Sequence, residues 1–152
     1  MNRRQFSMAL ASLAVTVGTA AVLPARAGQA RLSAPEAHER LRKGEILLLD
    51  IRRADEWRDT GIAEGATTLS MHDPAGPTGF LNAVLQAVEM NRDRPIALIC
   101  ASGVRSSWAQ RFLQANGFTR VDNVIEGMLG RGKAPGWIRR GLPVTPCRDC
   151  GG

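Results

Sequence analysis

Pro95-Ile-Ala-Leu-Ile-Cys-Ala-Ser-Gly-Val-Arg-Ser106 joins a continuous apolar run to a glycine-containing loop and then to an amphipathic segment. An apolar run of this kind is typical of a strand buried on both faces of a parallel sheet. The segment Glu45–Ile51 repeats the pattern earlier in the chain. After the loop, apolar residues recur at helical spacing as far as Leu113. The stretch therefore predicts a buried strand that ends at Cys100, a short loop, and a helix that begins near Ser106.

Helical segments alternate with these strands along the chain. A capping box at Ser33–Glu36 predicts the start of one helix, and Gly44 ends it. Helical spacing of apolar residues predicts a further helix over 80–90, and 121–125 has the composition of a short strand. The segment 73–79 is predicted to be a loop because it is rich in proline and glycine. The alternation predicts an α/β domain with a mainly parallel central sheet and helices on both faces.

Cys100 stands where a buried strand meets the start of a helix. The backbone N–H groups of such a loop point inward and, with the helix dipole, stabilise an anion. Gly103 permits the sharp turn, and Arg105 adds a cation whose planar fork suits a tetrahedral oxyanion. A cysteine at a strand end is otherwise a small buried hydrophobe. Here its position before this loop favours a catalytic nucleophile, with a substrate-binding loop made of Ala101, Ser102, Gly103, Val104, Arg105 and Ser106.

At this loop the sequence resembles the single-domain rhodanese family. The resemblance extends from about Arg31 to Val144, and the family's active-site loop corresponds to Ile99–Ser106. The other matching landmarks are Leu48–Arg52, Glu56-Trp57, Gly65-Ala66, Gly117-Phe118, Gly127, Trp137 and Gly141–Pro143. The segment Gly61-Ile-Ala-Glu-Gly65 departs from the family pattern, which usually has Gly-His-Ile-Pro-Gly.

The resemblance implies a rhodanese-like α/β fold for residues 28–145 and a sulfurtransferase activity. In that family a sulfane sulfur passes from a donor such as thiosulfate to the active-site cysteine, here Cys100. It then passes to an acceptor such as cyanide or a protein thiol. The resemblance implies neither a cofactor nor a metal.

Two other classes of function are alternatives. The first is a thiol redox or arsenate/phosphate enzyme. Cysteine phosphatases and arsenate reductases of related shape have five residues between cysteine and arginine, whereas four separate Cys100 from Arg105, and the narrower loop favours sulfur. The second alternative is a catalytically silent rhodanese-like binding module, although such modules commonly lack the cysteine. Arg52 is a further candidate for attracting an anionic donor, and the alternative is that Asp50 and Arg52 only pair with neighbouring residues and hold the fold.

A second cysteine motif lies in the tail formed by residues 146–152. Cys147 and Cys150 are separated by two residues, and a metal site would need two further ligands. In an oxidising compartment a local disulfide is the simplest interpretation. The alternative is a relay, in which one of these thiols accepts sulfur from Cys100 or reduces it.

Residues 1–27 have the pattern of a cleavable signal peptide. Arg3-Arg4 precedes an uncharged run over 8–24, and Ala25-Arg-Ala27 resembles a cleavage site. A membrane anchor is the alternative, but an interrupted run of about 17 residues is marginal for crossing a bilayer. Arg3-Arg-Gln-Phe6 also resembles the twin-arginine export signature, with an ordinary secretory signal as its alternative. We expect a periplasmic or otherwise exported protein that has no membrane span after cleavage.

The charge pattern limits the partners. Removal of residues 1–27 takes away three of the 20 basic residues and none of the 14 acidic residues, which leaves a net charge of +3. The remaining basic residues are scattered among acids, without the dense basic run and interleaved aromatics of a nucleic-acid-binding surface. We therefore expect a small anionic substrate and no nucleic acid. The resemblance implies that this substrate is a sulfur donor and that a protein thiol can be the acceptor.

Overall fold

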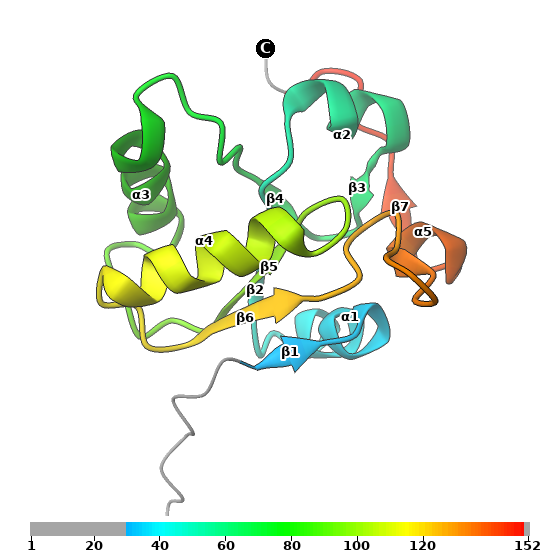
Figure 1. The fold of residues 1–152 in the computed structure, drawn as a ribbon, viewed down its shortest axis with the longest axis horizontal. Helices are drawn as coiled ribbons and strands as arrows, with labels where there is room; N and C mark the ends of the chain where they lie inside the picture. The colour runs from blue at the N-terminus through cyan, green and yellow to red at the C-terminus, as the bar shows by residue number, and fades with distance from the viewer. Residues whose placement is uncertain (1–29, 151–152) are drawn as a thin grey trace, which may run out of the picture.

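A five-stranded parallel sheet forms the centre of the molecule (Figure 1). The computed structural model describes residues 30–150, so the predicted signal peptide at 1–27 lies outside the described residues. The strand order is β1-β6-β5-β2-β4. These strands are β1 (Arg31–Leu32), β2 (Leu47–Asp50), β4 (Thr67–Thr68), β5 (Ile96–Ile99) and β6 (Val121–Val124). A small antiparallel pair is made by β3 (Ile62–Ala63) and β7 (Val144–Thr145).

Helices cover both faces of the sheet, which confirms the predicted fold class. The helices are α1 (Ala34–Arg42), α2 (Ala54–Thr60), α3 (Gly76–Ala87), α4 (Val104–Ala115) and α5 (Gly136–Arg139). Side chains of α3 and α4 pack in one core cluster, and side chains of α1 and α5 pack in another on the opposite face. Among the helices of residues 30–150, none is long and apolar enough to cross a membrane.

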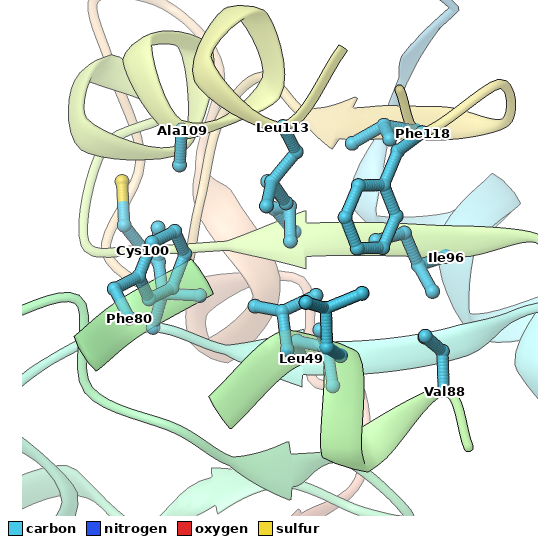
Figure 2. Close-up of a cluster of buried hydrophobic side chains, with 13 residues drawn as sticks. Leu49, Phe80, Val88, Ile96, Cys100, Ala109, Leu113 and Phe118 are labelled. Carbon is cyan, nitrogen blue, oxygen red and sulfur yellow. The ribbon is translucent and has the colours of Figure 1, made fainter. Parts of the chain in front are cut away.

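The two central strands supply both clusters because their side chains alternate between the faces of the sheet. Leu49 and Leu98 belong to the cluster under α3 and α4, whereas Leu48 and Ala97 belong to the other. Figure 2 shows the first cluster, with the sulfur of Cys100 at one end of it beside Phe80. The continuous apolar composition of β2 and β5 thus follows from burial on both faces, as the sequence predicts.

Two helices begin earlier than the sequence predicts, and α3 also ends earlier, at Ala87 instead of residue 90. Helix α3 begins at Gly76 rather than at residue 80, so the prediction of a loop over 73–79 is wrong for its second half. Proline is compatible with the first helical turn, where its missing N–H needs no partner, and Pro77 occupies such a position. Helix α4 begins at Val104, two residues before the predicted start. The predicted capping box of Ser33 and Glu36 is present at the start of α1.

The buried carboxylate of Glu126 ties two helices to the end of β6. Its oxygens accept hydrogen bonds from the N–H groups of Ala34, at 2.8 Å, and Gly136, at 2.9 Å, which lie at the starts of α1 and α5. The Nε of Arg140 donates to the same carboxylate at 2.9 Å. Burial by itself would raise the pKa of Glu126, but these three donors together hold its pKa below the ordinary value of 4.5.

Replacing this carboxylate should destabilise the fold. We expect Glu126→Gln to lower the free energy of unfolding at pH 7 by about 2 kcal/mol, because charge-assisted bonds to buried donors are lost. The pKa of Glu126 is depressed in the folded state, so the ionised carboxylate stabilises the fold fully at pH values above its ordinary pKa of 4.5. This stabilisation disappears as the pH falls through the folded-state pKa. The difference in unfolding free energy between wild type and variant should therefore be smaller in acid than at pH 7, as measured by urea unfolding under the two conditions.

Glu39→Gln is the control for this comparison. Glu39 also lies on α1 and pairs with Lys43, but both side chains are largely exposed to solvent. Solvent screening makes such pairs weak, so this variant should lose much less stability than Glu126→Gln. Equal losses in the two variants at pH 7 would contradict the structural role of Glu126.

Candidate active site at Cys100

The sulfur of Cys100 is surrounded by hydrogen-bond donors of the loop that follows β5. The N–H of Gly103 donates to Sγ at 3.2 Å, and the N–H of Ser106 donates at 3.5 Å. The hydroxyl oxygen of Ser106 lies 3.3 Å from Sγ. The residue is 1% exposed. The inward-pointing N–H groups that the sequence predicts are therefore present, and such a nest stabilises negative charge on sulfur.

The path of the loop is set by contacts with the segment after β6. The carbonyl of Cys100 accepts from the N–H of Met128, and the carbonyl of Ala101 accepts from the N–H of Leu129, both at 2.8 Å. Gly103 has a φ of +82°, and a Cβ at this position would overlap the carbonyl of Ile125. Only glycine adopts this φ readily and also has no Cβ to overlap the carbonyl, so Gly103 lets the loop turn back under the first turn of α4.

The predicted loop residues are not equally accessible. Ala101 and Ser102 are half-buried at the surface of the loop, and Gly103 and Ser106 are buried under it. Val104 begins α4 and is 56% exposed. A ligand that approaches the loop would therefore meet the outer backbone of residues 101–104 before it met the sulfur.

Arg105 is held by a carboxylate from α2. Its Nη1 donates to Oε2 of Glu56 at 2.7 Å, and its Nη2 donates to Oε1 at 2.6 Å, which makes a two-pronged pair. The bond from Arg105 holds the pKa of Glu56 below its ordinary value, although partial burial acts in the opposite direction. The same pair raises the pKa of Arg105. The predicted substrate-binding cation thus already has an anionic partner within the protein.

Arg52 has a structural role, and its predicted role in attracting a substrate is wrong. The side chain is fully buried, and all three guanidinium nitrogens donate to protein atoms. Nε and Nη2 donate to the carboxylate of Asp50, and the remaining bonds go to Thr60 and to the carbonyls of Glu56 and Gly61. Because no donor is left for a ligand, the structural alternative fits Arg52, and the structure identifies Asp50 as its main partner.

Asp50 and Arg52 together position α2 next to the loop. The Nε1 of Trp57 on α2 donates to Asp50 Oδ1 at 3.0 Å. Arg52 bonds to the carbonyl of Glu56 and, beyond the end of the same helix, to the carbonyl of Gly61. In the sheet, Asp50 lies opposite Ile99, the residue before Cys100. The buried pair therefore anchors α2 at the carboxyl ends of the strands, where Cys100 follows β5.

Cys147 and Cys150 are joined by a disulfide, with their Cα atoms 5.4 Å apart. The tail follows β7, and among its described residues the carbonyl of Cys150 accepts a hydrogen bond from Nη1 of Arg58 on α2 at 3.0 Å. Cys100 is the free cysteine of the described residues. Within residues 30–150, no cluster of three or more His, Cys, Asp or Glu side chains is arranged to hold a metal ion.

Comparison with known proteins places this site in a family. A family model for the rhodanese-like domain matches residues 33–130, which include the strand, the loop and the helix around Cys100. The chain belongs to the rhodanese-like domain family. The rhodanese-like domain here is similar to a protein of Allochromatium vinosum named a sulfurtransferase, with 32% identity over 101 residues that cover 66% of this chain and 79% of that protein.

Solved structures agree with the rhodanese-like fold. The crystal structure of Rv0390 from M. tuberculosis matches with a TM-score of 0.59 and 26% identity, over 78% of this chain and 98% of that one. The solution structure of a polysulfide-sulfur transferase homodimer from Wolinella succinogenes matches with a TM-score of 0.57 and 20% identity, over 82% and 83% of the two chains. The second likeness concerns the fold alone.

Sequence reasoning missed one member of the site, Glu56. Glu56 belongs to one of the family landmarks, but the sequence pattern predicts no role for it at Cys100. Its acidic side chain stands in the first turn of α2, a common place for a carboxylate, so its local pattern does not distinguish it from Asp55. The 49-residue separation between Glu56 and Arg105 left no local signal for their pairing.

The close packing of Gly103 can be tested with a matched pair of substitutions. Gly132 also has a positive φ, of +59°, but a Cβ there would meet no atom within 4 Å. Gly132→Ala should therefore lose only the cost of a left-handed backbone, about 1 kcal/mol of unfolding free energy. Gly103→Ala should lose at least about 2 kcal/mol more, because its methyl group overlaps the Ile125 carbonyl. Urea unfolding measures both, and equal losses would contradict the contact.

Proposed function

We propose that this protein is a sulfurtransferase that carries a sulfane sulfur as a persulfide on Cys100. The observation that carries the proposal is the convergence of the Gly103 and Ser106 N–H groups on the Cys100 sulfur. A persulfide keeps its negative charge on a sulfur next to Sγ, so the same donors can stabilise it. Membership of the rhodanese-like family and the similarity to the Allochromatium vinosum sulfurtransferase support this reaction.

The reaction has two displacement steps, with thiosulfate as the test donor. In the first, the Cys100 thiolate attacks the outer sulfur of thiosulfate, the sulfur–sulfur bond of the donor breaks, and sulfite leaves with the bonding electron pair. In the second, an acceptor such as cyanide or a protein thiolate attacks the outer sulfur of the persulfide. The Cys100 thiolate is then the leaving group, and the nest stabilises it at the end of the cycle as at the beginning.

The geometry favours sulfur transfer over chemistry on phosphate or arsenate. Four residues separate Cys100 from Arg105, so the loop encloses less space than a five-residue phosphate loop. The Glu56 carboxylate occupies both terminal nitrogens of Arg105, so Arg105 is not free to bind the oxygens of a phosphate or an arsenate. A silent binding module has no need for the ordered donors around a cysteine sulfur.

Mass spectrometry of the intact protein tests the proposal. Incubation with thiosulfate should add the mass of one sulfur atom, and later addition of cyanide should remove it. Cys100→Ser should gain no sulfur, because it lacks the nucleophile. The double variant Cys147→Ser/Cys150→Ser should still gain sulfur, since loading requires only Cys100. Absence of an adduct from thiosulfate and from a persulfide donor would contradict the proposal, as would an adduct that persists in Cys100→Ser.

We also propose that the protein acts outside the cytoplasm, where it arrives by a twin-arginine export route and loses residues 1–27 by cleavage. The basic start, the uncharged run and Ala25-Arg-Ala27 support this. In cell fractionation, the wild-type chain should appear in the periplasm with an N-terminus near Gly28. The variant Arg3→Lys/Arg4→Lys should stay in the cytoplasm with its first 27 residues attached. Equal export of both forms would favour an ordinary secretory signal instead.

A further inference from the structure

Glu56 and Arg105 form the closest ion pair beside the cysteine loop. The pair uses both carboxylate oxygens and both terminal nitrogens, at 2.6 and 2.7 Å. The two side chains are 18% and 25% exposed, so water screens them less than it screens a surface pair. Arg105 is the only basic residue of the segment 100–106. Glu56 therefore neutralises the charge of Arg105, the cation that could attract an anionic donor.

The charges next to this pair cancel as well. Arg53, just before α2, makes a two-pronged contact with Asp55 at 3.0 and 2.9 Å. Its Nη1 also lies 4.0 Å from Oε2 of Glu56. Asp55, Arg53, Glu56 and Arg105 thus form a chain of alternating charges with no net charge. A donor that approaches from this side meets a neutral cluster instead of a free arginine.

We propose that Glu56 is a specificity-determining residue that makes Cys100 prefer sulfur donors with at most one negative charge, such as alkyl persulfides, over doubly charged thiosulfate. The inference rests on the proposed sulfurtransferase function. The nest around Sγ presents two N–H groups and one hydroxyl, enough to stabilise a single negative charge. Thiosulfate brings a second charge on its sulfonate oxygens, and the group suited to bind them is already bound to Glu56.

The preferred reaction balances without any further reagent. The Cys100 thiolate attacks the outer sulfur of R–S–SH, and a bond forms between Sγ and that sulfur. The sulfur–sulfur bond of the donor breaks, and RS⁻ leaves with the electron pair while the proton stays on the transferred sulfur. The products are the Cys100 persulfide and one thiolate. With this donor no sulfonate group has to be placed near Glu56.

The test compares two donors in variants that each remove one negative charge. The rate constant for sulfur loading on Cys100 is measured by intact mass with thiosulfate and with 2-hydroxyethyl persulfide. Glu56→Gln keeps a hydrogen-bond acceptor for Arg105 but frees its charge. Asp55→Asn removes a charge from the same helix turn and leaves the Glu56–Arg105 pair intact. Circular dichroism and thermal unfolding show whether each variant has kept the fold.

In Glu56→Gln, the ratio of the thiosulfate rate to the persulfide rate should rise about tenfold, because a like charge no longer opposes the sulfonate. In Asp55→Asn the ratio should change by less than about threefold, since the exposed charge is screened by solvent. Arg105→Gln leaves Glu56 without its partner and should lower the ratio below that of the wild type. This opposite shift provides a second measurement should Glu56→Gln fail to fold.

Four outcomes overturn the inference. If Glu56→Gln slows both donors by the same factor, Glu56 only positions Arg105. If the two acidic variants raise the ratio equally, the effect belongs to net charge and not to Glu56. If neither donor loads the wild-type protein, the proposed function fails and this inference fails with it. A wild-type protein that loads readily, with a ratio that no variant changes, overturns the specificity role alone.

Discussion

Tight packing of the loop between β5 and α4 is the constraint on which the rest of the site depends. Gly103 lies against the carbonyl of Ile125, and its positive φ turns the chain back on itself. Only because the turn is this tight do the N–H groups of residues 103 and 106 reach the same sulfur. The carbonyls of Cys100 and Ala101 are bonded to the backbone of Met128 and Leu129. The sulfur therefore meets hydrogen-bond donors, which favour a charged sulfur in both states of the proposed transfer cycle.

A second interaction, the buried ion pair of Asp50 and Arg52, holds α2 beside the loop. Burying Asp50 and Arg52 is costly unless every polar atom finds a partner. Here the pair is joined by the Trp57 indole, the Thr60 hydroxyl and backbone carbonyls at both ends of α2. These bonds hold α2 against the sheet edge. They act on the site indirectly, because the first turn of α2 carries the carboxylate that meets Arg105.

In the proposed function, the pairing of Arg105 with Glu56 changes which groups recognise an anionic donor. A free arginine would attract any oxyanion, and its fork would suit sulfonate, phosphate and arsenate alike. With Glu56 in place, recognition passes to the backbone dipoles around the sulfur, which are fixed in direction and carry only partial charge. In the proposed reaction, such dipoles select by shape and by the position of the charge, and they suit a persulfide sulfur that carries a single negative charge.

The sequence by itself determined the features that depend on neighbours along the chain. The apolar runs of β2 and β5, the capping box at Ser33 and the loop after Cys100 are local patterns, and all of them are present in the structure. The two-residue strands β1 and β4 left no pattern, because strands that short are defined by the partner to which they bond. Likewise, only the tertiary structure decided the roles of the arginines. Arg52 and Arg105 look alike in sequence, but one is buried against Asp50 and the other is held by a carboxylate 49 residues away. The partner of a charged side chain depends on which elements pack together, and the local sequence does not encode that choice.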